Sequence, residues 1–114
     1  MEYKRTIEIY KTYYIEFYKL LPLDVRTKVN YVLELIRTEN VIPEKYFKHL
    51  TGIKGLYEIR IEYKSNIYRI FCCLNKNKLV ILFNGFQKKT QKTPQKEIRQ
   101  AKRIMDEYFN EQKK

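Results

Sequence analysis

The stretch Leu56–Phe86, LYEIRIEYKSNIYRIFCCLNKNKLVILFNGF, decides the fold of this chain. It contains three runs of strand length that are rich in Ile, Tyr, Phe and Val, at 56–63, 67–74 and 79–86. Two short polar linkers, KSN and NKNK, separate the runs and are typical of hairpin turns. The pattern therefore predicts an antiparallel meander of three strands.

Alternation and helical spacing predict the elements that precede the meander. A weak alternation over 3–9 indicates a short first strand, and apolar residues at helical spacing indicate a helix over 11–21. A second helix is expected from Val25 to Thr38, with Asp24 as its N-cap. The stretch 40–55 has a proline, two glycines and no sustained period, so we expect an irregular connection there.

A final helix is expected after Pro94, because proline is favoured in the first helical turn. The order is then strand, two helices, three strands, helix. This order predicts a single α+β domain over 1–114, with helices packed on one face of an antiparallel sheet and the other face free.

The chain is strongly basic, which restricts the kind of partner it suits. It carries 24 Lys and Arg against 13 Asp and Glu, a formal net charge of +11. Such a charge on a small domain favours polyanions, because each neutralised phosphate releases a condensed counterion. A nucleic acid or an acidic protein is therefore the expected partner, and the alternative is that the excess lysine only maintains solubility.

The cysteine and histidine content argues against a metal site. Cys72 and Cys73 are adjacent in a strand and point to opposite faces, so they share neither a metal ion nor an ordinary disulfide. His49 is the single histidine, so we expect no His/Cys metal site and no cofactor. No apolar stretch approaches the roughly 18 residues of a membrane span, and we expect a cytoplasmic protein without a membrane partner.

Arg69 is the most informative residue of the meander. It lies within an otherwise apolar run, where a charge is costly unless it is paired or open to solvent. If the first two strands pair through their short loop, Arg60 lies nearly opposite Arg69. Two interpretations remain open: a cross-strand ion pair of Arg69 with Glu58 or Glu62, or two guanidiniums directed at one phosphate.

The end of the meander offers a second candidate for binding RNA. Phe86 is followed closely by Lys88 and Lys89, which combines an aromatic stacking surface with phosphate-neutralising charges. A solvated basic loop is the plain alternative. No Ser/His/Asp set and no glycine-rich phosphate loop is visible, so an enzyme built from these residues would act by positioning and electrostatics.

Several runs resemble the RelE/ParE toxin superfamily. They are KHL at 48–50, GLYEIRI at 55–61 and YRIF at 68–71. The run FNGFQKKTQKTP at 83–94, with Glu97, Ile98 and Ala101 after it, resembles the phage-derived HigB branch of that superfamily.

This resemblance implies a RelE-like fold and the toxin of a type II toxin–antitoxin pair. Such a toxin is held inactive by a cognate antitoxin, which is commonly a helix-turn-helix protein. The toxin contacts operator DNA only through this antitoxin. The free toxin enters the ribosome and cuts mRNA without a metal, by attack of the 2′-hydroxyl on the adjacent phosphate.

The resemblance also assigns roles to residues. Arg60 and Arg69 match the strand arginines that grip the scissile phosphate, and Lys88 and Lys89 match a basic catalytic pair. The residues expected to contact the substrate are Phe86, Lys54, His49, Lys92 and Tyr108.

Two other functions compete with the mRNA endoribonuclease. A ParE-like toxin has the same fold but inhibits DNA gyrase by binding alone. A basic RNA-binding module would keep the fold without catalysis. A ribonuclease requires the four basic residues named above, whereas a gyrase inhibitor tolerates their loss.

Overall fold

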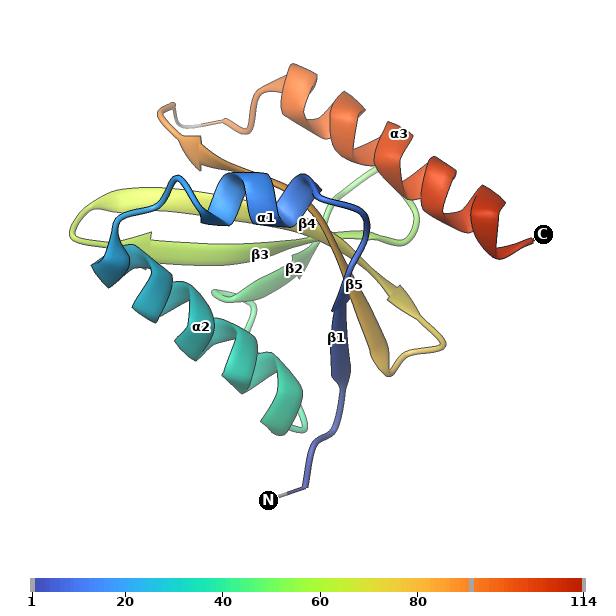
Figure 1. Ribbon diagram of the computed structural model, residues 1–114, viewed down its shortest axis with the longest axis horizontal. Helices are drawn as coiled ribbons and strands as arrows, with labels where there is room; N and C mark the ends of the chain where they lie inside the picture. Colours follow the sequence, from blue (N-terminus) through green and yellow to red (C-terminus); the bar gives the residue numbers. More distant parts are fainter. Residues whose placement is uncertain (1, 91, 114) are drawn as a thin grey trace.

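The computed structural model describes residues 2–90 and 92–113 and contains five strands and three helices (Figure 1). The strands form one mixed sheet in the order β1-β5-β4-β3-β2. The elements in chain order are β1 (Thr6–Ile9), α1 (Tyr13–Tyr18), α2 (Leu23–Thr38), β2 (Phe47–His49), β3 (Leu56–Tyr63), β4 (Asn66–Asn75), β5 (Leu79–Lys88) and α3 (Gln95–Gln112).

The predicted meander is confirmed and forms the centre of the sheet. β3 has the expected bounds, while β4 is one residue longer at each end and β5 extends two residues further, to Lys88. Lys64 and Ser65 join β3 to β4 with φ of 48° and 70°. Two successive residues with positive φ give the turn whose twist matches that of paired strands.

A register shift interrupts the pairing of β4 with β5 between Ile70 and Cys72. Along β5, Ile81 and Phe83 pack in the same cluster as Cys73 of β4. Further along β5, beyond the irregular pairing, Phe86 packs against that same cluster. The side chains of β5 that share this face therefore change from odd-numbered to even-numbered positions, because the extra residue of a bulge breaks the alternation.

The outer strands differ from the prediction. β1 begins at Thr6 and pairs with β5 in parallel, so the sheet is mixed and not wholly antiparallel. Two helices and three strands separate β1 from β5 in the chain, so no hairpin joins these two strands and imposes an antiparallel pairing. The predicted irregular connection contains β2, which pairs antiparallel with β3 and has only three residues, too few to show a period.

The helices are confirmed with shorter or shifted starts. α1 covers only Tyr13–Tyr18, since Lys11 has a φ of 55°. The N-cap of α2 is Pro22, so the prediction of Asp24 was wrong; Asp24 lies in the first turn, where its carboxylate accepts a 2.9 Å hydrogen bond from the Val25 N–H. α3 follows Pro94 as expected. No helix of the described residues is long and apolar enough to span a membrane.

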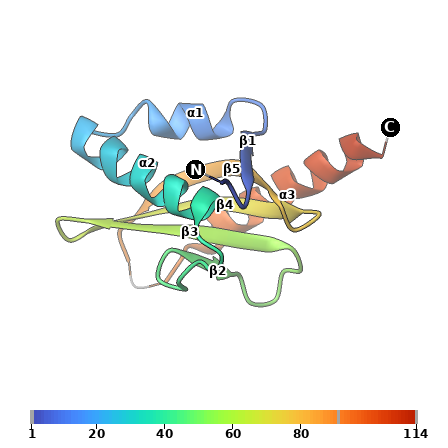
Figure 2. The same ribbon diagram turned by 90° about the horizontal axis from the view of Figure 1, so that it is seen from below.

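Helices cover both faces of the sheet, which corrects the prediction of one free face. α1 and α2 lie together on one side (Figure 2) and pack in a cluster with Ile59, Ile70 and Cys72. α3 packs on the opposite face against Phe71, Cys73 and the neighbouring apolar residues. The second face is apolar at one end and charged at the other, and only its apolar end requires a helix. The opposite orientation of the two cysteines is confirmed.

Candidate functional site

The charged side chains of the meander meet on the α3 face, beyond the part that α3 covers. Arg60 and Arg69 are direct cross-strand partners, as predicted, and Phe86 pairs with Arg69 on the other side. Lys88 pairs with Ile67, two residues before Arg69 in β4. Glu58 lies two residues before Arg60 in β3 and therefore on the same face. Side chains that face each other across a sheet also share a face. The charged residues on this surface are called the basic cluster: Glu58, Arg60, Arg69 and Lys88.

A single carboxylate lies between the two guanidiniums. The Oε1 atom of Glu58 is 3.4 Å from Arg60 Nε and 3.7 Å from Arg69 Nε. Both contacts are ion pairs that are too long for good hydrogen bonds. Among the described residues, the two Nε atoms and Glu58 Oε2 have no hydrogen-bond partner.

Arg69 is buried although it is charged. Its side chain is only 5% exposed, and a terminal nitrogen of the guanidinium donates a hydrogen bond to the Tyr68 carbonyl at 3.2 Å. Burial lowers the pKa of Arg69; Glu58 raises it and Arg60 lowers it. The arginine therefore retains donors that an incoming anion would satisfy.

Lys88 adds a third positive charge at the end of β5. Burial lowers its pKa, and the charge of Arg69 lowers it further. Three cations thus lie near one buried carboxylate, Glu58, whose charge also raises the pKa of Lys88. The ion pair of Arg69 with Glu58 is present, while the phosphate-directed interpretation stays a prediction, which the excess of positive charge in the cluster favours.

Aromatic surface borders the basic cluster. Phe86 is half-buried and stacks on Phe71, with ring centroids 5.7 Å apart and an angle of 19° between the rings. A ring fixed in this way next to cations is a surface on which an unpaired base can stack.

A hollow of about 340 Å³ adjoins the cluster at Glu58. Lys48 and His49 of β2 line it together with Gln95 at the start of α3. Lys48 lies opposite Glu58 in the sheet and pairs with Glu44 at 3.7 Å, while the exposed His49 ring makes an edge contact with Tyr57. His49 thus borders the cluster without belonging to it.

Two residues of the site were missed as functional candidates. Glu58 was considered only as an ion-pair partner, although alternation along the first meander strand already places it on the same face as Arg60. Lys48 carries no such signal, because its place opposite Glu58 depends on the unexpected strand β2.

Tyr108 lies away from the basic cluster, so its expected contact with the substrate stays a prediction that this site does not include. It is 6% exposed in the core, and its hydroxyl accepts a 3.0 Å hydrogen bond from Asn75 Nδ2. Asn75 is at the far end of β4 from Arg69, roughly 20 Å away at about 3.3 Å per residue. Tyr108 was matched by its place on the terminal helix, and sequence alone does not show which way that helix side chain points.

The other predicted residues lie in connections around the site. Lys89 directly follows β5 and is exposed, and the exposed Lys92 precedes α3. Lys54 is exposed in the connection between β2 and β3. Their long side chains add to the positive charge near the sheet face but have no fixed place in the basic cluster.

Metal-binding groups are scarce in the described part of the chain. It contains no group of three or more His, Cys, Asp or Glu placed to hold a metal ion. Burial raises the pKa of Cys72 well above its ordinary value and that of Cys73 to about 12, so both thiols remain protonated at neutral pH.

Comparisons with known proteins bear on the fold and on the family of this chain. The structure is similar to an archaeal RelE in the RelE–RelB complex from Pyrococcus horikoshii OT3, with a TM-score of 0.55 and 20% identity over 74% of this chain and 94% of that one. At this identity the match establishes the RelE fold alone. No curated protein sequence matches the chain. The family described as "Phage derived protein Gp49-like (DUF891)" matches residues 16–106, most of the chain. The chain therefore belongs to the Gp49-like family of phage-derived proteins.

Proposed function

We propose that this protein is a toxin of a type II toxin–antitoxin system, of the HigB kind, that cuts mRNA at the ribosome in the cytoplasm. The observation that carries the proposal is the opposed pair of Arg60 and Arg69 with only one carboxylate between them. Like charges directly opposite in a sheet are destabilising. Their retention on a partly open face is explained if a phosphate binds there.

The chemistry uses the RNA as its own nucleophile. The 2′-hydroxyl gives up its proton to solvent water as its oxygen attacks the adjacent phosphorus. The bond from phosphorus to the 5′-oxygen breaks, the 5′-oxygen takes up a proton, and the products are a cyclic phosphate and a 5′-hydroxyl. Negative charge develops on the phosphoryl oxygens, where Arg60 and Arg69 would donate charge-assisted hydrogen bonds.

Lys88 is the proposed proton donor to the leaving 5′-oxygen. Its lowered pKa makes the ammonium a stronger acid than an ordinary lysine. Phe86 would hold a neighbouring base by stacking, which keeps the phosphate over the guanidiniums. Lys89, Lys92 and Lys54 would neutralise flanking phosphates, and His49 would contact the substrate at the rim.

We further propose that a cognate antitoxin, a helix-turn-helix protein that carries the pair to operator DNA, holds the toxin inactive. The similarity to a RelE solved with RelB supports a partner of this class. The net charge of +11 supports an acidic contact surface on that partner.

The test is cleavage of mRNA on programmed ribosomes by Arg69→Ala and Arg69→Lys variants. Loss of the guanidinium should reduce the cleavage rate by a hundredfold or more, on the order seen when one transition-state donor is removed. Lysine should restore little, because it lacks the planar fork. Arg99→Ala, on the exposed surface of α3, is the matched control and should cleave normally.

The outcomes separate the three candidate functions. Mapped 5′ ends within codons that vanish in Arg69→Ala support the ribonuclease. Inhibition of gyrase without RNA cuts, unchanged in Arg69→Ala, would replace it with the ParE-like function. RNA binding without cleavage or toxicity would leave the non-catalytic module. Melting temperature and circular dichroism show whether each variant folds.

A further inference from the structure

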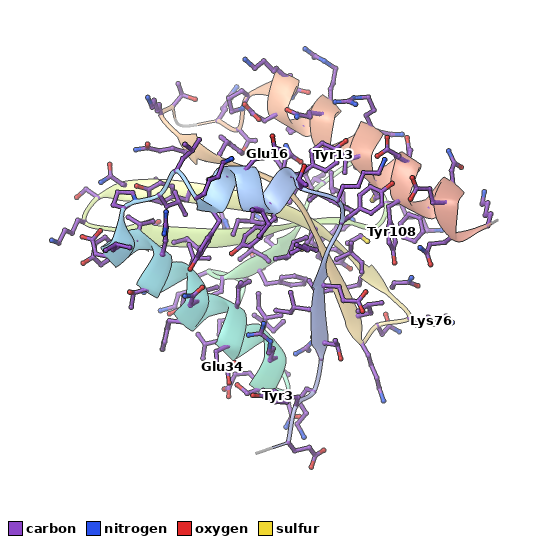
Figure 3. All side chains as sticks on the ribbon, in the orientation of Figure 1. Tyr3, Tyr13, Glu16, Glu34, Lys76 and Tyr108 are labelled. Carbon is purple, nitrogen blue, oxygen red and sulfur yellow. The ribbon has the colours of Figure 1, made fainter. Side chains whose placement is uncertain are left out.

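A second hollow, of about 620 Å³, lies along the outer edge of β5 between α1 and α3. Tyr13, Glu16 and Phe17 of α1 line one side, and Gln100 of α3 contributes to the lining. In Figure 3 Tyr13 and Glu16 lie on the side of α1 that faces α3. The floor is the segment Asn84–Gln87 of β5.

This part of β5 is an open strand edge. β1 pairs with Leu79–Leu82, and among the described residues no strand pairs with the outer edge of β5 beyond Leu82. An open edge presents backbone N–H and C=O groups that are a template for another strand. The hollow thus continues the line of β1 in the plane of the sheet.

Asn84 points to the kind of group that binds in this hollow. The residue is 6% exposed, and within the described structure neither Nδ2 nor Oδ1 has a hydrogen-bond partner. A buried amide without partners is costly. Its adjacent donor and acceptor are complementary to the C=O and N–H of a peptide bond.

The α1 side of the hollow offers apolar contact. Phe17 packs so closely over Gly85 that a Cβ there would be 2.6 Å from its ring. Leu20, at the rim, is 80% exposed. An exposed leucine next to an open edge is suited to an apolar side chain of an added strand.

We propose that an extended segment of a protein partner binds along β5 at Asn84–Gln87 as an added strand. Asn84, whose polar atoms are enclosed in the free protein, turns its amide to hydrogen-bond a peptide group of that segment, and Leu20 and Phe17 contact one of its apolar side chains. The net charge of +11 favours acidic residues in the parts of the segment that lie outside the hollow, because the charged side chain among the described residues that line the hollow is Glu16 and not a Lys or Arg. Only the identity of the partner rests on the proposed function, under which it is the antitoxin.

The added strand would lie beside the basic cluster and not on it. The hollow and the candidate site share Phe86, while Arg60, Arg69 and Lys88 are outside the hollow lining. Binding of a peptide and binding of a phosphate can therefore be changed separately by mutation.

The test selects peptides from a phage-displayed library of random dodecapeptides on the full-length protein, without RNA. Enriched peptides are labelled, and their affinities are measured by fluorescence anisotropy. Leu20→Glu and Asn84→Ala should each weaken binding about tenfold or more, the effect of one lost apolar contact or hydrogen bond. Leu23→Glu, at a similarly exposed leucine outside the hollow, is the matched control and should bind within about twofold.

A second measurement locates the peptide. Hydrogen exchange should show peptide-dependent protection of amides in Gly85–Gln87. The proposal is overturned if no peptide is enriched, if Leu20→Glu binds as well as Leu23→Glu, or if protection appears elsewhere. The amides of Gly85–Gln87 could instead become protected without peptide when the protein dimerises. If Leu20→Glu abolishes that protection, the occupant of the β5 edge is a second copy of this chain and the proposal is overturned. None of these results depends on RNA cleavage, so failure of the ribonuclease proposal would be recognised separately.

Discussion

At the scale of the residue, the candidate site depends on one carboxylate shared by two arginines. Glu58 is buried between Arg60 and Arg69 and leaves Oε2 without a partner among the described residues. Alternation on the first two meander strands was sufficient to predict the opposition of the arginines. It was insufficient to place Lys48 and Tyr108, whose positions depend on a three-residue strand and on the rotation of a helix.

Glu58→Gln should make the protein less stable and more responsive to anions. Removing one partner of a buried ion pair costs about 3–5 kcal/mol, because the other charge is left unpaired. Inorganic phosphate would then bind more tightly, and its stabilisation follows RT ln(1 + [L]/Kd). Thermal unfolding with and without phosphate should show a larger shift in melting temperature for Glu58→Gln than for wild type. Glu8→Gln, on an exposed residue of β1, should behave as wild type.

The lowered pKa of Lys88 predicts a pH dependence of cleavage. A protonated donor is lost as pH rises through its pKa, so kcat/KM should fall with rising pH. The midpoint should lie below the value of about 10.4 for an ordinary lysine, because the folded protein lowers this pKa. In Lys88→Arg the fall should disappear, since a guanidinium stays charged across the range. An unchanged profile in Lys88→Arg would remove Lys88 from proton transfer.

At the scale of the element, the contact of α1 with β5 depends on the absence of one side chain. Phe17 occupies the space above Gly85 where a Cβ would be placed, within 2.6–2.8 Å of three ring atoms. Local patterns predicted the helix and the strand. They could not predict this contact, because it joins elements far apart in the sequence.

Gly85→Ala should lower the free energy of unfolding by about 1–3 kcal/mol through overpacking. In the double variant Gly85→Ala/Phe17→Ala the alanine methyl would have room, so the two losses should not add. Urea unfolding of the four proteins in this cycle measures the coupling. Strict additivity would show that the ring moves aside without cost.

At the scale of the whole molecule, charge and fold act together. The sheet places three cations at one end of a face whose other end α3 covers. The composition predicted a polyanionic partner, and the element order predicted the α+β class. The covered second face was missed because the element order does not show on which face of the sheet the final helix packs.

Binding of a short single-stranded RNA should weaken steeply with salt. The three cations of the basic cluster and Lys54, Lys89 and Lys92 make six proposed phosphate contacts. At about 0.7 per contact, they predict a slope of about −4 for log K against log salt concentration. Arg60→Ala should make the slope shallower by about 0.7. Arg99→Ala should leave it unchanged. Fluorescence anisotropy over a series of salt concentrations provides the slopes, and a wild-type slope near zero would exclude phosphate contacts.

The register shift between Ile70 and Cys72 has a consequence for how this protein tolerates insertions and deletions. One extra residue lets the same strand supply core side chains from odd positions and site side chains from even ones. Deleting a residue there would restore the regular count and turn Phe86 and Lys88 toward α1, away from the arginines. The three helices, the hairpins of the meander and the amino-acid composition would all be kept after this deletion. Relatives that differ by a single residue in this segment would therefore share the fold and lack the site.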